Sequence, residues 1–232
     1  MGKITALRMN KGRGQLVSVY VDGSLAFSVG KAIAAREGLR PEQELSEDRI
    51  EALTRRDRYE RCLAAATGYL ALRPRSLSEL KIRLKRHGFD AETLDSVTGT
   101  LKAQGLLDDA AFARFWTDNR QSFSPRSRRM TRIELQRKGV TRDIVDDAVS
   151  AIDDEESAYR AAAGRLRSLR NADYEQFLRR LGSYLARRGF GYDVIRRTVE
   201  RAWKEAEHQE TFPANGNAGR IEHTTFNLTE GR

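Results

Sequence analysis

The sequence contains little cysteine, proline or tryptophan. Cys62 is the only cysteine in 232 residues, so no internal disulfide can form, and its apolar neighbours predict a buried, inert thiol. Proline occurs four times and tryptophan twice. Because proline interrupts helices, whereas alanine, leucine, arginine and glutamate favour them, this composition predicts long helices.

A membrane segment is also missing from the sequence. No apolar run approaches the roughly 18–20 residues that a membrane-spanning helix needs. The first residues, Met1–Asn10, lack the apolar core of a secretory signal. We therefore expect a cytoplasmic protein that makes no contact with a membrane.

Residues that build catalytic centres are sparse. The three histidines are far apart in the sequence, at His87, His208 and His223. With one cysteine they cannot form a conventional zinc site, and no Gly-x4-Gly-Lys-Ser/Thr phosphate loop is present. The adjacent carboxylates of Asp108 and Asp109 are explained by the preference for acids at a helix start. We expect no enzyme, no cofactor and no metal; a nuclease using Asp108 or Asp109 is the enzymatic alternative.

Positive charge, in contrast, is in excess. The formal net charge is +9, and charged residues make up 32% of the chain against 39% for hydrophobic ones. Such a polar composition suits an elongated chain better than a single compact core. A positive field attracts polyanions, so DNA or RNA is the first partner to consider and an acidic protein surface is the second.

Strand-like patterns are confined to the N-terminal part. The turn dipeptide Asp22-Gly23 lies between two apolar, partly alternating runs, which predicts a small antiparallel hairpin or sheet over residues 3–28. A short helix is expected over residues 29–37. Ser46 is placed to cap a further helix, or pair of helices, that runs to about Leu72.

The rest of the chain contains an internal repeat of about fifty residues. The triplet Pro74-Arg75-Ser76 recurs as Pro125-Arg126-Ser127. Each copy has a helix that ends in a glycine, at Gly88, Gly139 and Gly189, spaced 51 and 50 residues apart. In the first copy Ser76 and Glu79 form a Ser-x-x-Glu capping box, and a left-handed glycine closes the helix.

The sequence therefore predicts a mainly α fold of three tandem three-helix repeats in an extended array, preceded by the small sheet. The helices expected in the second and third repeats span residues 109–123, 127–138, 142–152, 155–169, 174–188 and 192–207. The expected organisation is residues 1–58 for the hairpin and first helices, 59–108, 109–154 and 155–207 for the repeats, and 208–232 for a disordered tail.

Clusters of arginine are the main functional signal. Between Arg120 and Arg142 the only acid is Glu134. Guanidinium groups bind phosphate or carboxylate through two donors at once, so a binding surface explains such a run better than a solvated helical face does. The candidate binding residues are Arg120, Arg126, Arg128, Arg129, Arg132, Arg137, Lys138, Arg179, Arg180, Arg187 and Arg188. Aromatic residues at helical spacing, such as Phe112 and Trp116, are interpreted as core residues.

These motifs together resemble the RecX family of regulators of the recombinase RecA. Two segments carry most of the resemblance, Gly105–Asp109 with the downstream Phe112, Trp116 and Arg120, and Glu134-Leu135 with Lys138-Gly139-Val140. The first repeat is similar through Tyr69-Leu70, Arg73, Arg75-Ser76, Glu79-Leu80, Leu84 and Gly88-Phe89. The resemblance covers roughly residues 3–207. Ser127 stands where the family pattern has glycine.

The resemblance implies three tandem three-helix repeats and no catalytic centre. It also implies binding within the groove of the RecA filament. We expect a monomer that contacts single- and double-stranded DNA directly or through that filament. The expected result is inhibition of ATP hydrolysis and strand exchange by RecA, and hence regulation of recombination, DNA repair and the SOS response. The alternative is a stand-alone helical-repeat protein that binds DNA or RNA.

Overall fold

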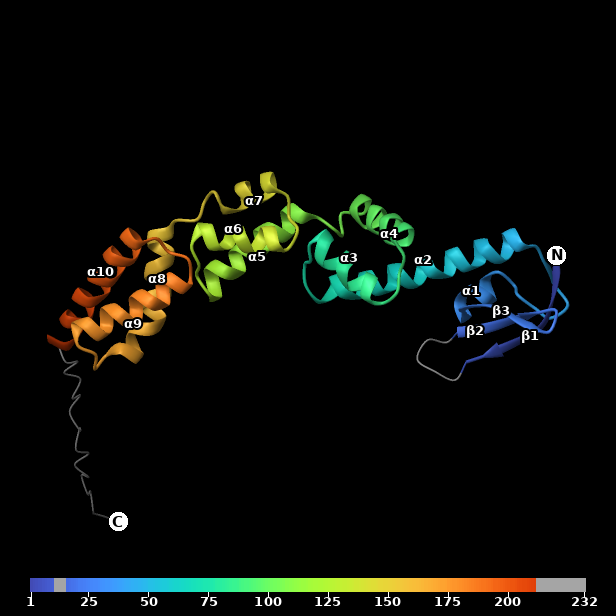
Figure 1. The fold of residues 1–232 in the computed structure, drawn as a ribbon, viewed down its shortest axis with the longest axis horizontal. Helices are drawn as coiled ribbons and strands as arrows, with labels where there is room; N and C mark the ends of the chain where they lie inside the picture. The colour runs from blue at the N-terminus through green and yellow to red at the C-terminus, as the bar shows by residue number, and fades with distance from the viewer. Residues whose placement is uncertain (11–15, 212–232) are drawn as a thin grey trace, which may run out of the picture. The chain divides into compact units, whose positions relative to one another are not determined.

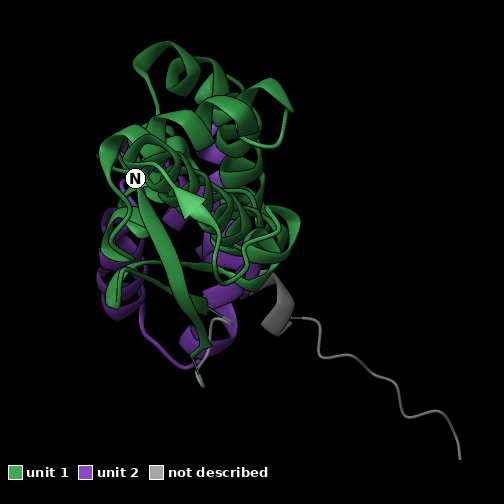
Figure 2. Ribbon diagram, turned by 90° about the vertical axis from the view of Figure 1, so that its right-hand side faces the viewer, with its two compact units in different colours: residues 1–124, 128–152 green, residues 125–127, 153–232 purple. Residues whose placement is uncertain are grey.

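The computed structural model describes residues 1–10 and 16–211, and these residues fall into two compact units. Residues 1–124 and 128–152 form the first unit, and residues 125–127 and those from 153 onward form the second (Figure 2). The chain is mainly helical with one small sheet near the N-terminus (Figure 1), as the sequence predicts. No helix in the described ranges is long and apolar enough to cross a membrane.

The first unit begins with a four-stranded sheet in the order β3-β2-β1-β4. The strands are β1 (Gly2–Met9), β2 (Leu16–Val21), β3 (Ser24–Gly30) and β4 (Glu44–Leu45), and every pair is antiparallel. Asp22 and Gly23 form the β2–β3 turn with positive φ angles of 49° and 85°, which confirms the predicted hairpin. The two-residue strand β4 carries no sequence signal and was not predicted.

The helix predicted over residues 29–37 is shorter in the structure, where α1 spans Lys31–Arg36. Val29 and Gly30 belong to β3 instead. Val29 is fully buried in the apolar cluster of the sheet and is paired with Val17, so tertiary packing overrides the local pattern.

One long helix, α2 (Glu47–Leu72), serves both the sheet and the first repeat. Ser46 caps it by accepting a hydrogen bond from the backbone N–H of Arg49 at 3.2 Å, as predicted. Its first half packs on the sheet through the buried Leu53 and through Asp57, whose carboxylate accepts from the N–H of Gly30 at 2.6 Å. The helix is continuous across the boundary expected after residue 58.

The second half of α2 forms the first repeat with α3 (Leu77–Arg86) and α4 (Ala91–Ala103). Gly88 ends the α3 turn with φ +85°, and Asp90 caps α4 by accepting from the N–H of Thr93 at 2.9 Å. Cys62 is completely buried against the leucines of α3 and α4, and burial raises the pKa of its thiol to about 11. The burial of Cys62 that the sequence predicts is confirmed.

The second repeat completes the first unit with α5 (Asp109–Phe123), α6 (Arg128–Arg137) and α7 (Arg142–Val149). Its core contains Phe112, Leu135, Val145 and Val149, each almost fully buried. Fully burying one such side chain stabilises a fold by about 1.5–3 kcal/mol. The bounds of α5 agree with the predicted helix, whereas α6 is shorter than predicted by two residues and α7 by three.

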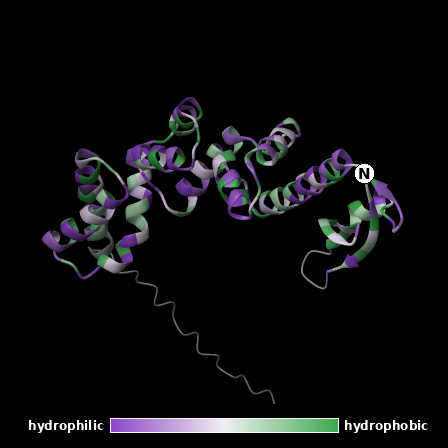
Figure 3. Cartoon of the chain, turned by 45° about the vertical axis from the view of Figure 1, so that its right-hand side comes forward, coloured by the Kyte–Doolittle hydropathy of each residue, from purple (hydrophilic) through white to green (hydrophobic). Residues whose placement is uncertain are grey.

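The second unit contains the third repeat, formed by α8 (Asp154–Leu166), the 3-10 turn η1 (Arg167–Leu169), α9 (Tyr174–Arg187) and α10 (Tyr192–Thr211). Phe177, Leu181, Leu185 and Val199 form its core. Hydrophobic and hydrophilic residues alternate along the helices of the chain (Figure 3), as expected for helices that bury one face. A disordered tail is expected from His208, but α10 continues to Thr211, so residues 208–211 are helical. Residues 212–232, with His223, lie outside the described residues, and so does the rest of the expected tail.

Candidate protein and nucleic-acid interface

Lys138, one of the predicted binding residues, lies at the contact between the first and second repeats. Ser76, at the start of α3, donates its hydroxyl to the carbonyl of Lys138 at 2.6 Å. The Lys138 ammonium contacts the Glu79 carboxylate at 2.5 Å. The N–H of Leu77 donates to the carboxylate of Asp109 at 2.8 Å. Lys138 and Asp109 therefore fasten the end of α6 and the start of α5 to α3.

This arrangement corrects one detail of the predicted capping box. Ser76 does cap α3, accepting from the N–H of Glu79 at 3.1 Å. The Glu79 carboxylate, however, pairs with Lys138 and with Arg73, the latter at 3.2 Å. Burial by itself would raise the pKa of Glu79, but the hydrogen bonds from Lys138 and Arg73 outweigh burial, and the pKa is lowered.

Trp116 lies beneath two of the predicted binding residues. The Nζ atom of Lys138 is 4.0 Å from the centroid of the indole ring, and the Cζ atom of Arg120 is 4.5 Å from it. Glu134 accepts from the indole N–H at 2.8 Å and from Nε of Arg120 at 2.7 Å. Arg120 and Lys138 are thus neutralised and half-buried within the unit, and their first role is to stabilise it.

Two more arginines of the second repeat also bind acceptors of the same unit. Arg128 donates from Nε to the carbonyl of Ile152 at 3.1 Å, and Arg132 pairs with Asp146 at 3.0 Å. Arg126 is half-buried. Only Arg129 and Arg137, among the candidates on α6, are exposed with no hydrogen bond or ion pair to the described part of the chain.

The candidates on α9 divide in the same way. Arg188, just after the helix, donates to the carbonyl of Pro125 at 2.9 Å and lies 4.5 Å from the centroid of the Tyr184 ring. Its own carbonyl accepts from the N–H of Ser127 at 3.2 Å. Exposed guanidinium groups without a partner in the described residues are those of Arg179, Arg180 and Arg187.

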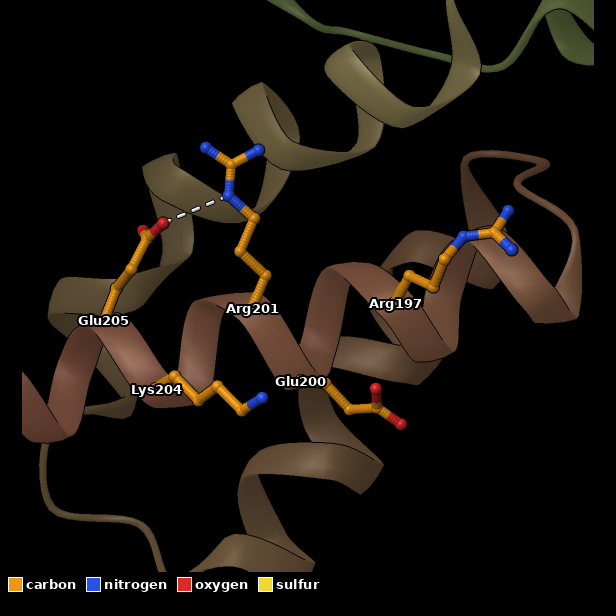
Figure 4. Close-up of a pocket in the computed structure, with 5 residues that line it drawn as sticks. All are labelled: Arg197, Glu200, Arg201, Lys204 and Glu205. Carbon is orange, nitrogen blue, oxygen red and sulfur yellow. Dashed lines mark hydrogen bonds and ion pairs between the residues drawn. The ribbon is translucent and has the colours of Figure 1, made fainter.

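The neighbouring face of α10 shows the opposite pattern, in which bases and acids alternate (Figure 4). Arg201 pairs with Glu205 at 3.1 Å and lies 3.6 Å from the centroid of the Tyr159 ring. Arg197 pairs with Glu155 at 2.7 Å. This face presents little net charge, so density of arginine in the sequence does not by itself identify a cationic surface.

The structure also places the residues considered for catalysis. His87 ends α3 at the surface, and its Nε2 atom is 2.7 Å from the hydroxyl of Tyr69. Asp108 caps α5 by accepting from the N–H groups of Ala110 and Ala111. Within residues 1–10 and 16–211, no group of three or more histidine, cysteine, aspartate or glutamate side chains is placed to hold a metal ion.

Family models match all three repeats. The RecX first, second and third three-helix domains match residues 62–99, 108–149 and 153–199 respectively. A regulatory protein RecX of Amycolatopsis mediterranei is 35% identical over 157 residues, which are 65% of this chain and 90% of that protein. The chain belongs to the RecX family. The resemblance inferred from the motifs is thereby confirmed.

Further RecX relatives agree with this assignment. The regulatory protein RecX of Clostridium botulinum strain Eklund 17B is 27% identical over 207 residues, covering 87% of this chain and 97% of the relative. A crystal structure of regulatory protein RecX has a TM-score of 0.59 at 24% identity, over 86% of this chain and all of that one. RecX from Lactobacillus salivarius has a TM-score of 0.54 at 19% identity. The solved structures support the fold, and the named relatives identify a regulatory protein.

Proposed function

We propose that this RecX-family protein inhibits RecA by binding the filament that RecA forms on DNA. The observation that carries the proposal is the match of all three repeats to the RecX domains, together with relatives named as regulatory proteins. The protein acts as a cytoplasmic monomer, needs no cofactor, and performs its role by binding rather than by catalysis.

The binding surface that we assign consists of the arginines left unpaired by the fold. They are Arg129, Arg137, Arg179, Arg180 and Arg187, all exposed and without an ion pair to the described residues. Arg120, Arg132 and Lys138 are excluded from this first set because carboxylates of the same unit already neutralise them. An unpaired guanidinium keeps its full charge for a phosphate or carboxylate of a partner.

The unpaired arginines recur with the repeat. Arg129 and Arg179 occupy equivalent positions fifty residues apart, as do Arg137 and Arg187. Within each helix the two arginines are eight residues apart, or about 12 Å along the axis at 1.5 Å per residue. A protein whose cations recur from repeat to repeat is suited to a partner that also repeats, as a recombinase filament and a DNA backbone both do.

The test is a titration of the single-strand-dependent ATPase of RecA with the purified protein. We expect the ATPase rate to fall with added wild-type protein, and to fall much less with a variant in which Arg129, Arg137, Arg179 and Arg187 are changed to Gln. A matched control changes four paired arginines of α2 and α10, Arg55, Arg56, Arg196 and Arg201, to Gln and should retain inhibition. No effect of saturating wild-type protein on the ATPase would reject the proposal.

A further inference from the structure

The second unit contains a concavity of about 190 Å³ in which basic groups meet without a carboxylate. Its lining consists of Arg165, Ser168, Leu169, Arg180, Leu181, Tyr184 and Arg187. The residues come from α8, η1 and α9, so the site is formed by the fold and not by one helix surface. Its floor is apolar, because Leu169 is 7% exposed and Leu181 is fully buried.

Comparison of the second and third repeats explains why this concavity stays cationic. Glu134 precedes Lys138 by four residues, and Tyr184 precedes Arg188 by the same interval. In the second repeat the carboxylate of Glu134 neutralises the adjacent guanidinium of Arg120. In the third repeat the uncharged ring of Tyr184 occupies the position of Glu134. The ring contacts the neighbouring guanidinium groups but does not neutralise their charge.

The ring of Tyr184 positions one lining cation, Arg165, and the adjacent Arg188, which is not part of the lining. The Cζ atoms of Arg165 and Arg188 lie 4.7 Å and 4.5 Å from its centroid. A cation over an aromatic face is attracted by the ring quadrupole and keeps its net charge. Arg180 and Arg187 contribute two further exposed guanidinium groups with no ion pair in the described ranges. The site is thus assembled in advance for an anion.

We propose that this concavity binds a phosphodiester group of a single-stranded nucleic acid, independently of base sequence. Three lining guanidinium groups offer more donors than the two oxygens of one carboxylate can accept, whereas a phosphate group with its ester oxygens accepts more of them. A base would have to displace Arg165 or Arg188 to stack on Tyr184, so the contact reads the backbone and not the bases. The inference rests on the proposed function, to which it adds one DNA contact on the third repeat.

The experiment measures binding of a fluorescein-labelled oligo-dT of about fifteen nucleotides to the full chain in the absence of RecA. The NaCl concentration is varied around a reference of about 0.1 M, from roughly 50 to roughly 300 mM. In the test variant Arg180 and Arg187 are changed to Gln; both are exposed, so folding should be unaffected. Loss of one phosphate contact should make the slope of log affinity against log salt shallower by about 0.7, and should weaken binding about fivefold at 0.1 M.

A matched control removes the same charge from paired arginines of the same unit, Arg196 and Arg197, by change to Gln. It should alter the affinity less than about twofold, since these groups are already neutralised. Tyr184→Glu copies the second repeat and should weaken oligo-dT binding as much as the double variant does. Circular dichroism of each variant verifies that the fold is retained.

An oligo-dT affinity and salt slope that stay unchanged in the double variant would overturn the phosphate site. So would equal losses in the test and control variants, because total charge alone would then explain binding. Unchanged oligo-dT binding with a lost effect on the RecA ATPase would assign the concavity to a protein carboxylate and also overturn it. Loss of oligo-dT binding in a protein that has no effect on RecA would support the site and reject the proposed function.

Discussion

Lys138 offers the sharpest test of the idea that part of the basic run is structural. Changing Lys138 to Met removes the ammonium group that contacts Glu79 at 2.5 Å and lies 4.0 Å from the centroid of the Trp116 ring. A hydrogen bond to a charged group contributes about 1.5–3 kcal/mol and a cation–π contact about 0.5–1 kcal/mol. Glu79 keeps Arg73 as a partner, so we expect the free energy of unfolding to fall by about 2 kcal/mol.

The assay is urea unfolding followed by tryptophan fluorescence in a Trp203→Phe background, which leaves Trp116 as the single reporter. A cycle with Glu79→Gln should give a coupling energy of about 1 kcal/mol or more between Lys138 and Glu79. Lys102→Met is the control, because Lys102 is exposed at the end of α4 and should change the free energy by less than about 0.5 kcal/mol.

The same pair also makes stability depend on pH. The folded pKa of Glu79 lies below its ordinary value of 4.5, so the ionised carboxylate stabilises the fold above that value. This contribution is lost as the pH falls through the lowered folded pKa. In Lys138→Met the loss of stability on acidification from pH 6 to pH 3 should be smaller than in the parent. Equal stability of the two proteins at pH 6, or a coupling energy near zero, would refute the structural role of Lys138.

Two further predictions concern the glycines and the cysteine. Gly139→Ala should lower the free energy of unfolding of the first unit in urea by more than Gly88→Ala does. Both glycines have positive φ, which costs about 1–2 kcal/mol for alanine. Only at Gly139 would the new Cβ also lie 2.4 Å from the Cβ of Ser78. Equal losses would mean that α3 does not approach Gly139 this closely. Cys62 should resist a thiol reagent such as DTNB at about pH 8 in the folded protein, because burial raises its pKa to about 11. In concentrated urea the exposed thiol should react within seconds. Rapid labelling of the folded protein would show that the helices of the first repeat open readily.

Local signals in the sequence were sufficient for most of the fold. Ser46 and Ser76 cap helices where the sequence predicts caps, and Gly88 adopts the left-handed conformation that ends a helix. These features depend on a few adjacent residues. Val29 lies in β3 and not in the predicted helix, because it pairs with Val17 on the neighbouring strand. Such pairing depends on tertiary structure, and the local helical pattern does not indicate it.

The sequence could not predict which of the candidate binding residues are paired within the fold, because charge neutralisation depends on tertiary contacts. The run around α6 has Glu134 as its only acid in sequence, yet Glu79 neutralises Lys138 from 59 residues away. Asp146 on α7 likewise pairs with Arg132. Arg165 and Tyr184 are not among the predicted binding residues, although aligning the repeats at Gly139 and Gly189 places tyrosine in the position of Glu134.

The continuous helix α2 has a consequence for how this protein loses its structure. Leu53 lies in the apolar cluster of the sheet, whereas Cys62 and Ala66 lie in that of the first repeat, and all three belong to the same uninterrupted helix. Unfolding of α2 would expose both apolar clusters to solvent at once, so the sheet and the first repeat cannot unfold in separate steps. The amide protons of the sheet and of the first repeat should therefore exchange with solvent as one cooperative group. Limited proteolysis should not cleave the chain within α2, between the sheet and the first repeat.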